Sequence, residues 1–531
     1  YEAAAGFDTA CVTRPAGKLP LACFGLFRQP RLTAHPGDGE TAATAPWRMS
    51  ISRHDYAAGI AAIREQIAEG NTYQINYTVR QRASDVADPW ALFLGVASDA
   101  PYAAYIDGGD HVIVSASPEL FFEMDGDAIA CRPMKGTAPR GLTLEEDLAL
   151  RERLRASPKD RAENVMITDM VRNDLGRIAE AGSVRAAALC EVEKYRTVWQ
   201  ITSTVQATSN ASVARVFKAL FPCASVTGAP KVASMKLIAA LEDSPREIYT
   251  GAIGFMAPGR KARFNVAIRT AWIDRATNTA TYGVGGGIVW DSDADAEYHE
   301  CLDKARILSA RAPRRDFELL ETLLWRPEEG WVLRDAHLAR MADSAAYFDF
   351  TFDRARLIAG LDELPARLLL EPCRARILLA RDGAVRFEAA VLPSGDTAAP
   401  FRLRLAPHPV DRRNPFLYHK TTERSVYDEA RAAAGDCDDV LLWNEAREIT
   451  ESTIANFVVR RRGRLVTPPV ECGLLRGTLR QELLEEGRIH EERITLDALQ
   501  DADEIWLVNS VRGWIPCRLE SFTGGRSTAA G

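Results

Sequence analysis

The spacing of apolar and polar residues predicts several helices and strands before any motif is considered. Apolar side chains recur at Ile60, Ile63 and Ile67 within residues 55–70, so we expect an amphipathic helix that ends at a glycine. β-branched and aromatic residues are frequent over 73–80, which predicts a strand. The two patterns place a helix directly before a strand in this part of the chain.

Further along, residues 144–156 predict a helix that ends before a Ser-Pro pair, and strands separated by Gly and Asn dominate 248–290. After a short basic stretch a new pattern begins, with a strand at 317–325 and a helix at 335–347. This change predicts four segments: a domain over 1–310, a linker over 311–316, a second domain over 317–521 and a flexible tail over 522–531.

Composition and charge exclude several classes of protein. The chain has 531 residues, 47% hydrophobic and 26% charged, which is typical of a globular protein of two to four domains. A net charge of -7 without a long basic run argues against nucleic acid as a partner, and no stretch of about 18 apolar residues could span a membrane. The 10 cysteines form no C-x-x-C pair, which favours a reducing cytoplasm. Because the chain opens without Met or signal peptide, we expect the first domain to be incomplete at its N-terminus.

Two acidic pairs in the first domain have the same spacing. Asp160 and Glu163 are three residues apart, as are Glu297 and Glu300, so each pair shares one face of a helix. Two such faces opposite each other would give an oxygen-rich pocket suited to Mg²⁺. On spacing alone, two solvated helix faces are the more common arrangement.

Motifs around these pairs narrow the choice. In order along the chain, they are E-N-V-M-I-T-D-M-V-R-N-D-L-G at 163–176, V-T-G-A-P-K at 226–231, I-R-T at 268–270, G-V-G-G-G at 283–287 and E-x-x-E-x-x-x-K at 297–304. The set resembles the chorismate-utilising enzymes, and the order over some 240 residues makes chance agreement negligible. The resemblance implies an α+β fold in which antiparallel sheets and helices enclose the active site.

The same resemblance implies roles for single residues. Glu163 and Glu300 would hold Mg²⁺, with Asp160 and Glu297 beside them, and Thr137 would donate a hydrogen bond near the substrate's ring. The carboxylates of chorismate would be bound by Tyr249, Arg269, Gly287 and Lys304.

Three positions indicate which reaction the first domain performs. Relatives that use water carry a Lys where this chain has Gln74, and Gln cannot act as a base, which points to ammonia. Lys135, in P-M-K-G-T, resembles the aminodeoxychorismate synthases, whereas anthranilate synthases have Ala there. Gln200 stands where relatives often carry a His that assists pyruvate elimination, so elimination should be poor here.

The chemistry expected of Lys135 is covalent. A neutral Lys135 amine would attack ring C2 and expel the C4 hydroxyl, after which ammonia would attack C4 and expel the lysine. The alternative is a lysine that only forms a salt bridge. None of the cysteines lies in the G-x-C-x-G context of a glutaminase, so a separate glutaminase subunit would supply the ammonia.

Residues 317–520 resemble the group of branched-chain aminotransferases, D-amino acid aminotransferases and aminodeoxychorismate lyases. The matching segments are Glu321-Thr322, H-L-A-R at 337–340, H-K-T-T-E-R at 419–424, I-T-E-S-T-I-A-N at 449–456, L-L-R-G-T at 474–478 and N-S-V-R-G at 509–513. The resemblance implies a two-lobed α/β pyridoxal-phosphate domain of fold type IV, which usually dimerises.

Within that domain, Lys420 would bind the cofactor covalently and carry a proton, and Glu451 would pair with the pyridine nitrogen. The remaining cofactor-binding residues implied by the resemblance are Arg340, Asn456, Gly477, Thr478 and Ser510. Arg476 departs from the Pro that is common before Gly-Thr. An exposed surface lysine is the alternative for Lys420.

The two resemblances together predict a bifunctional enzyme that makes 4-aminobenzoate, a folate precursor, from chorismate and ammonia. One rival is an anthranilate-type synthase joined to a D- or branched-chain aminotransferase. A second rival is a catalytically silent regulatory subunit.

Overall fold

The computed structural model of the protein divides into two compact units. The first comprises residues 1–140 and 150–313, and the second comprises residues 141–149 and 314–531. The structure describes residues 1–31, 46–86, 88–97, 100–308, 317–364, 371–392 and 399–520. The predicted linker and the predicted tail lie outside these ranges. Within them, no helix is long and apolar enough to cross a membrane.

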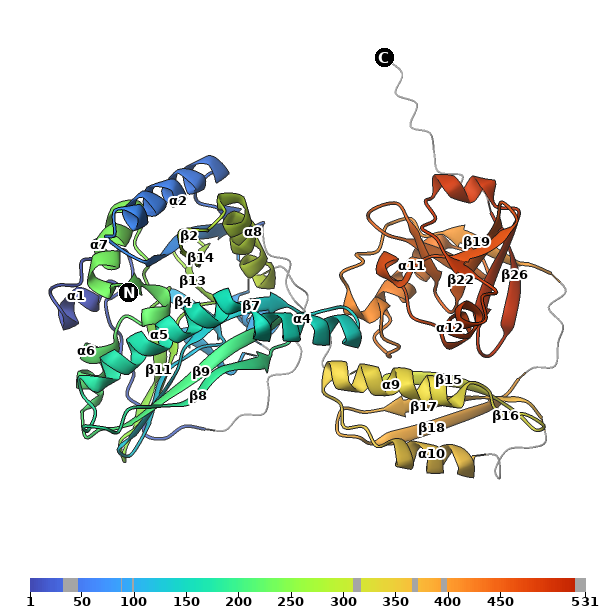
Figure 1. Ribbon diagram of the computed structural model, residues 1–531, viewed down its shortest axis with the longest axis horizontal. Coiled ribbons are helices and arrows are strands. Elements are labelled where there is room, and N and C mark those ends of the chain that lie inside the picture. Colours follow the sequence, from blue (N-terminus) through green and yellow to red (C-terminus); the bar gives the residue numbers. More distant parts are fainter. Residues whose placement is uncertain are drawn as a thin grey trace, which may run out of the picture. The chain divides into compact units, whose positions relative to one another are not determined.

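Two antiparallel sheets form the first unit (Figure 1), each with seven strands among the described residues. The first runs in the order β1-β2-β14-β13-β4-β3, with β10 paired to β2, and the second runs β11-β12-β5-β6-β9-β7, with β8 paired to β9. The strands of the first sheet are β1 (Arg48–Met49), β2 (Gln74–Ser84), β3 (Tyr102–Asp107), β4 (His111–Ser117), β10 (Gly228–Ala229), β13 (Thr270–Asp274) and β14 (Thr279–Ile288). Those of the second are β5 (Leu120–Asp125), β6 (Ala128–Arg132), β7 (Met134–Pro139), β8 (Arg185–Lys194), β9 (Val198–Thr208), β11 (Ala252–Ala257) and β12 (Lys261–Val266).

Helices cover both sheets. α5 packs on β7, β8 and β9, whereas α8 packs on β14 and α2 (Figure 1). The helices are α1 (Ala4–Phe7), α2 (Arg53–Ala68), α3 (Pro89–Ala97), α5 (Pro158–Gly176), α6 (Val213–Leu220), α7 (Lys231–Leu241) and α8 (Ala294–Ala305), with short 3-10 turns at Ala224–Val226 and Arg306–Leu308. Helix α4 (Leu144–Ala156) is divided, since its residues up to 149 belong to the second unit and the rest to the first. The predicted helices at 55–70 and 144–156 and the predicted strands at 73–80 and 248–290 are confirmed.

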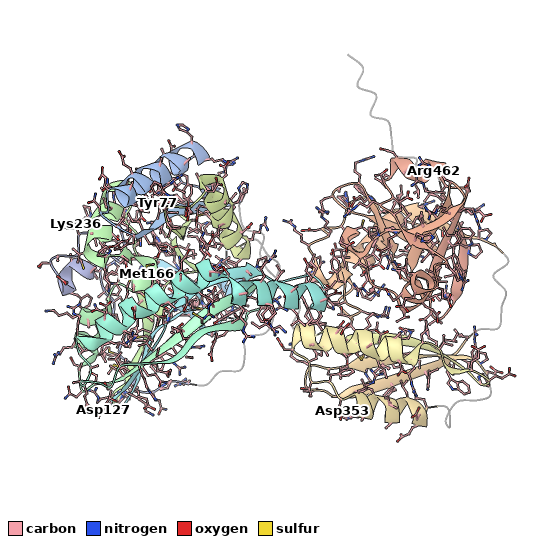
Figure 2. All side chains as sticks on the ribbon, viewed as in Figure 1. Tyr77, Asp127, Met166, Lys236, Asp353 and Arg462 are labelled. Carbon is pink, nitrogen blue, oxygen red and sulfur yellow. The ribbon has the colours of Figure 1, made fainter. Side chains whose placement is uncertain are left out.

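Local sequence explains where the two helices with acidic pairs begin. The Ser157 hydroxyl accepts a hydrogen bond from the Asp160 amide, and Pro158 occupies the first turn of α5, where its missing N–H costs nothing. Asp293 caps α8 in the same way. The sheets supply the apolar surface against which these helices pack. Figure 2 shows the contrast within the unit: Tyr77 of β2 is buried, whereas Lys236 of α7 is exposed.

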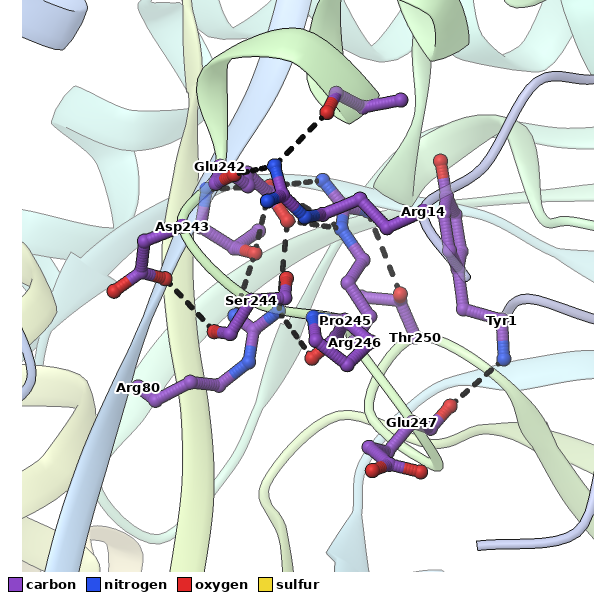
Figure 3. A network of polar contacts seen from close by, with 12 residues as sticks. Tyr1, Arg14, Arg80, Glu242, Asp243, Ser244, Pro245, Arg246, Glu247 and Thr250 are labelled. Carbon is purple, nitrogen blue, oxygen red and sulfur yellow. Dashed lines mark hydrogen bonds and ion pairs between the residues drawn. The ribbon is translucent and has the colours of Figure 1, made fainter. Parts of the chain in front are cut away.

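A buried polar network holds β2 in place (Figure 3). Arg246 and Glu242 are both almost fully buried and lie 2.6 Å apart. Glu242 also accepts hydrogen bonds from the Thr78 amide at 3.0 Å and hydroxyl at 2.8 Å, and Arg246 donates to the Asn76 carbonyl at 2.6 Å. Because a buried ion pair is stable only when its remaining groups are hydrogen-bonded, the network fixes the strand that carries Gln74.

The second unit contains a small and a large sheet, with helices packed on them (Figure 1). The small sheet has the order β16-β15-β17-β18. The large one has the order β21-β20-β19-β26-β25-β22-β23-β24, and a further pairing of β21 with β22 closes six of its strands into a ring. The small sheet comprises β15 (Leu319–Arg326), β16 (Gly330–Trp331), β17 (Cys373–Leu379) and β18 (Val385–Val391). The large sheet comprises β19 (Phe401–Leu405), β20 (Asp439–Trp443), β21 (Ile449–Ser452), β22 (Asn456–Arg461), β23 (Arg464–Thr467), β24 (His490–Glu491), β25 (Glu504–Asn509) and β26 (Gly513–Leu519).

Each sheet of the second unit has its own apolar core. Leu338 and Met341 of α9 pack with Leu319 and Leu323 of β15, so the helix covers the small sheet. The helices are α9 (Arg334–Phe348), α10 (Arg354–Glu363), α11 (Ser425–Ala434) and α12 (Thr478–Glu485), with 3-10 turns at Pro415–Leu417, Val470–Cys472 and Asp497–Asp501. The predicted strand at 317–325 and helix at 335–347 are confirmed, as are both predicted fold classes: an α+β unit followed by a two-lobed α/β unit.

Candidate functional site

Lys135 connects three of the four predicted acidic ligands in the first unit. Asp160 and Glu163 lie one turn apart on α5, and Glu297 and Glu300 lie one turn apart on α8. The Lys135 ammonium, on β7, lies 3.6 Å from Glu163 Oε2, and its charge also acts on Glu297 and Glu300. The two helices and the strand therefore meet at one place.

Gly287 marks the point where Lys135 and Gln74 approach each other. A Cβ atom on Gly287 would stand 2.4 Å from Lys135 Nζ and 2.1 Å from Gln74 Nε2, so any side chain there would displace both groups. Gln74 is 3% exposed, and within the described residues nothing donates a hydrogen bond to its Oε1. The amide oxygen is therefore available to a donor on a bound molecule.

The two glutamates of α8 respond differently to this environment. Desolvation raises the pKa of Glu297, and the neighbouring Glu300 carboxylate adds to the increase. Desolvation also acts to raise the pKa of Glu300, but the Lys304 ammonium, 2.6 Å away, outweighs it and the pKa is lowered. Glu300 therefore carries the more firmly held negative charge of the pair.

Lys304 and Arg269 lie beside the same glycine-rich strand. Lys304 donates to the Gly285 carbonyl at 2.8 Å, and a Cβ on Gly286 would stand 3.9 Å from its Nζ. Arg269 adopts a left-handed backbone conformation (φ 50°) and donates to the Lys304 carbonyl at the end of α8. Its charge acts on Glu300. Two cations and the glycine-rich end of β14, which has no side chains there, thus lie beside the acidic cluster, an arrangement suited to a carboxylate ligand.

The remaining predicted substrate-binding residues of the first unit, Thr137, Gln200 and Tyr249, have different surroundings. The Thr137 hydroxyl donates to Gln200 Oε1 at 2.8 Å, and Gln200 donates to the Gly136 carbonyl at 2.7 Å, so both hold the irregular part of β7 that follows Lys135. Tyr249 is buried, with its ring against Gly283 and 5.6 Å from the Arg80 guanidinium. The described contacts of Tyr249 thus connect it to the core rather than to the acidic cluster.

Two residues of this site were missed by the sequence analysis. Glu119 is 3% exposed, accepts a hydrogen bond from the Ser225 hydroxyl at 2.7 Å and feels the charge of Lys135. Burial raises its pKa to about 7, so it can hold a proton at neutral pH. Asn164, next to Glu163, donates to the Lys135 carbonyl at 3.2 Å and fixes the backbone of that lysine. One feature of the sequence could have revealed Glu119: it is a single acidic residue in the segment S-P-E-L-F-F at 117–122, beside three apolar residues.

The acidic cluster fits a magnesium ion that is bound by only one or two protein carboxylates. Among the described residues, no three His, Cys, Asp or Glu side chains lie close enough to enclose a metal. Mg²⁺ commonly uses only one or two carboxylates, with water and substrate oxygens completing its shell. Glu163 and Glu300, each paired with a lysine in this structure, supply such carboxylates.

In the second unit, Lys420 and Glu451 lie close enough for their charges to interact. Burial lowers the pKa of Lys420 to about 8, and Arg340 contributes to the decrease. Burial raises the pKa of Glu451 to about 7, although its carboxylate accepts hydrogen bonds from the Leu475 amide and Tyr427 hydroxyl. A half-buried lysine whose pKa is lowered by desolvation is typical of one that reacts with a carbonyl group.

The predicted phosphate-binding residues lie near that lysine. Arg340 donates to the Arg476 carbonyl at 3.0 Å, directly before Gly477 and Thr478. Gly477 caps α12, and in the described part of the chain no side chain caps the helix, so its first amides are available to an anion. A Cβ on Gly477 would stand 1.9 Å from Asn456 Oδ1, so the glycine is required there. Asn456 Nδ2 also donates to Glu451 at 3.1 Å and so connects the two ends of the site.

Three further residues of the second site were not assigned from sequence. Tyr427 donates to Glu451 at 2.8 Å. Glu321 lies 2.7 Å from Arg340 and 2.6 Å from His337. Glu321 and His337 both stood inside motifs that matched, but the motifs alone did not show that they touch. The half-buried lysine, the glutamate and the uncapped helix together fit pyridoxal phosphate.

Two family models match the chain. Residues 21–310 match the model described as chorismate binding enzyme, and residues 318–519 match the model described as amino-transferase class IV.

The chain is also similar to individual proteins. It is 41% identical over 283 residues to an aminodeoxychorismate synthase of Streptomyces pristinaespiralis, covering 52% of this chain and 39% of the relative. It is 40% identical over 272 residues to aminodeoxychorismate synthase component 1 of Klebsiella aerogenes, covering 50% and 59%. A solved structure of a putative amino-acid aminotransferase from Mesorhizobium loti shares 39% identity, covers 39% of this chain and 100% of that one, and has a TM-score of 0.37. The chain thus spans about two fifths to three fifths of the length of these two curated relatives.

Proposed function

The chain belongs to the chorismate binding enzymes through residues 21–310 and carries an amino-transferase class IV domain over 318–519, and from this premise we propose that it converts chorismate and ammonia to 4-aminobenzoate. The observation that carries the proposal is the approach of Lys135 and Gln74 at Gly287. A nucleophilic amine and an amide that cannot act as a base are what amination without hydrolysis requires. The names of the relatives from Streptomyces and Klebsiella support the same reaction.

In the first step, the Lys135 ammonium gives up a proton to solvent, and the resulting amine forms a bond to C2 of chorismate while the C4–O bond breaks. Glu119 gives its proton to the departing hydroxyl, which leaves as water, and the proton released by the amine returns to the Glu119 carboxylate. Ammonia, held by Gln74 Oε1, then forms a bond to C4 while the C2–N bond to Lys135 breaks. Glu119 gives its proton to the departing lysine nitrogen and takes one up from the new C4 ammonium. The product is 4-amino-4-deoxychorismate, and Lys135 is regenerated.

The charged residues around Lys135 would hold the substrate's carboxylates. Lys304 and Arg269 provide the cations, and the bare backbone of Gly285 to Gly287 allows close approach. Mg²⁺ bound by Glu163 and Glu300 would polarise a carboxylate of chorismate and help the hydroxyl to leave.

In the second unit, Lys420 removes the proton from C4 of the amino intermediate. The electron pair of that C–H bond forms the C3–C4 double bond, the C3–O bond breaks, and pyruvate leaves after its enol takes up a proton. Pyridoxal phosphate, when bound, supplies an electron-accepting ring that stabilises the charge left at C4. Glu451 would hold the proton on the pyridine nitrogen, and Arg340, Thr478 and Ser510 would bind the phosphate.

The proposed partners follow from this chemistry. A separate glutaminase subunit would release ammonia for the first unit, and the second unit would form a homodimer. We place both activities in the cytoplasm, because all ten cysteines are free thiols, as is usual in a reducing compartment.

The proposal is tested by an endpoint assay of the purified chain with chorismate, Mg²⁺, ammonium at mildly alkaline pH and pyridoxal phosphate. We expect 4-aminobenzoate and pyruvate in equal amounts. Accumulation of aminodeoxychorismate alone would show that the second unit is not the lyase. Formation of 2-aminobenzoate would favour an anthranilate-type synthase instead, and unreacted chorismate would favour a silent subunit.

Glu119→Gln is expected to lower the rate of amination about 100-fold, because the leaving hydroxyl loses its proton donor. The wild-type rate should fall as pH rises through about 7, since only the protonated Glu119 can donate. The variant should lack this dependence when free ammonia is held constant. Glu123→Gln, in β5 four residues after Glu119 but with a partly exposed side chain, is the control. Equal rates for the two variants would rule out Glu119 as the acid.

A further inference from the structure

A buried chain of hydrogen bonds ends at the two hydroxyls assigned to the cofactor's phosphate. His337 Nδ1 lies 2.6 Å from Glu321 Oε2, and His337 Nε2 lies 3.0 Å from Ser510 Oγ and 3.2 Å from Thr478 Oγ1. The side chains of His337 and Glu321 are each 1% exposed. Arg340 contacts both oxygens of the same Glu321 carboxylate, at 2.8 and 2.7 Å. Four elements, β15, α9, α12 and the turn after β25, thus meet at one imidazole.

The contacts determine which ring nitrogen can titrate. Arg340 and His337 outweigh the effect of burial and lower the pKa of Glu321 to about 2, so Glu321 is a carboxylate without a proton to donate. His337 Nδ1 must therefore carry the hydrogen of that contact. In the neutral ring, Nε2 is then an acceptor facing two hydroxyls. At least one of Ser510 and Thr478 must use its single hydrogen on Nε2.

A phosphate dianion needs hydrogen-bond donors, and a neutral His337 ring reduces the number of donors that Ser510 and Thr478 can offer it. A hydroxyl that donates to Nε2 presents lone pairs to an anion, which repels it. If Nε2 is protonated, it donates instead, and both hydroxyl hydrogens become free to turn toward the anion. The positive charge on the ring would attract the same anion.

We propose that His337 takes up a proton when the cofactor's phosphate binds, and that this proton converts Ser510 and Thr478 into donors for the phosphate. The inference rests on the proposed function, since it assumes that the second unit binds pyridoxal phosphate. It makes His337 a positioning residue, because the imidazole acts on the phosphate through the two hydroxyls.

The charged groups around His337 set the sign of the pH dependence. Burial lowers the pKa of His337, Glu321 opposes this effect, and Arg340 and Lys420 reinforce it, so the ring of the free protein is neutral at mildly alkaline pH. A bound dianion would raise the pKa. Between the two pKa values binding must bring a proton with it, so affinity should fall as pH rises, by up to about tenfold per pH unit.

The test uses pyridoxine 5′-phosphate, which has no aldehyde and so cannot react with Lys420. Its binding to the full chain is measured by titration calorimetry from pH 7.5 to 8.5 in buffers of different ionisation enthalpy. We expect the wild-type protein to take up about one proton more than His337→Gln, which cannot titrate. The variant should bind about tenfold more weakly at pH 7.5 and show a flatter pH dependence. His408→Gln, an exposed histidine of the same unit, should behave like the wild type.

Equal proton uptake in the wild type and His337→Gln, with both binding the probe, would overturn the inference but leave the cofactor assignment intact. Failure of the wild type to bind would overturn both. If the variant does not fold, the protonation of the His337 ring is measured instead, by nitrogen NMR of histidine-labelled wild-type protein at pH 8. Protonation of both His337 ring nitrogens on adding the probe supports the proposal, and an unchanged ring contradicts it.

Discussion

Lys135→Ala is expected to lower the rate of chorismate amination at least about 1,000-fold, because the variant has no amine to form the covalent intermediate. The structure leaves little room for a substitute. Lys135 and Gln74 fill the space above Gly287, and the glutamates nearby are acceptors rather than nitrogen nucleophiles. The rate is measured by following aminodeoxychorismate formation with ammonium as the nitrogen source.

A second variant separates the nucleophile from the salt bridge. Lys135→Arg keeps a positive charge that can pair with Glu163, but its guanidinium stays protonated and does not attack carbon. If Lys135 only pairs with Glu163 at 3.6 Å, the Arg variant should retain most of the activity. We expect it to be as inactive as the Ala variant. Lys236→Ala, an exposed lysine of α7, controls for nonspecific effects and should match the wild type.

The elements that could be predicted from sequence are those whose own periodicity determines them. The isoleucines of α2 and the Ser-Pro pair after α4 mark a helix and a helix end without reference to the rest of the chain. The spacing of Glu297 and Glu300 likewise placed them on one helical face, and α8 has them there. Such local patterns act before tertiary contacts form.

The same reasoning could not show what these residues face. The i,i+3 spacing of Asp160 and Glu163 predicts an acidic face, but the lysine that pairs with Glu163 is Lys135, which comes from β7. Glu119 was missed because a single acid directly before an apolar strand has no periodicity of its own. Its pKa is raised by burial, and the hydrogen bond from Ser225, more than 100 residues away in the sequence, opposes that increase. His337 and Glu321 were missed for the same reason, since their contact joins a strand to a helix.

Lys420→Ala is expected to lower pyruvate release about 10⁴-fold while leaving the amination of chorismate unchanged. The residue has two roles that no neighbour can take over, since it binds the cofactor and moves the C4 proton. Lys420 is the only lysine between residues 317 and 531, so the second unit has no other amine side chain of this kind. Aminodeoxychorismate should therefore accumulate at the wild-type rate, which is measured by chromatography beside the pyruvate assay.

Three results distinguish the roles of Lys420. Loss of both products would mean that the substitution damages the fold, and normal pyruvate release would mean that the second unit uses another base. Partial recovery of pyruvate release on adding a small primary amine would show that proton transfer is the missing function, because a free amine can replace the base but not its position. Recovery should increase with pH through about 8 or higher, since only the unprotonated amine accepts the C4 proton. The buried site makes this requirement strict: the same desolvation that lowers the pKa of Lys420 disfavours any charged amine that enters.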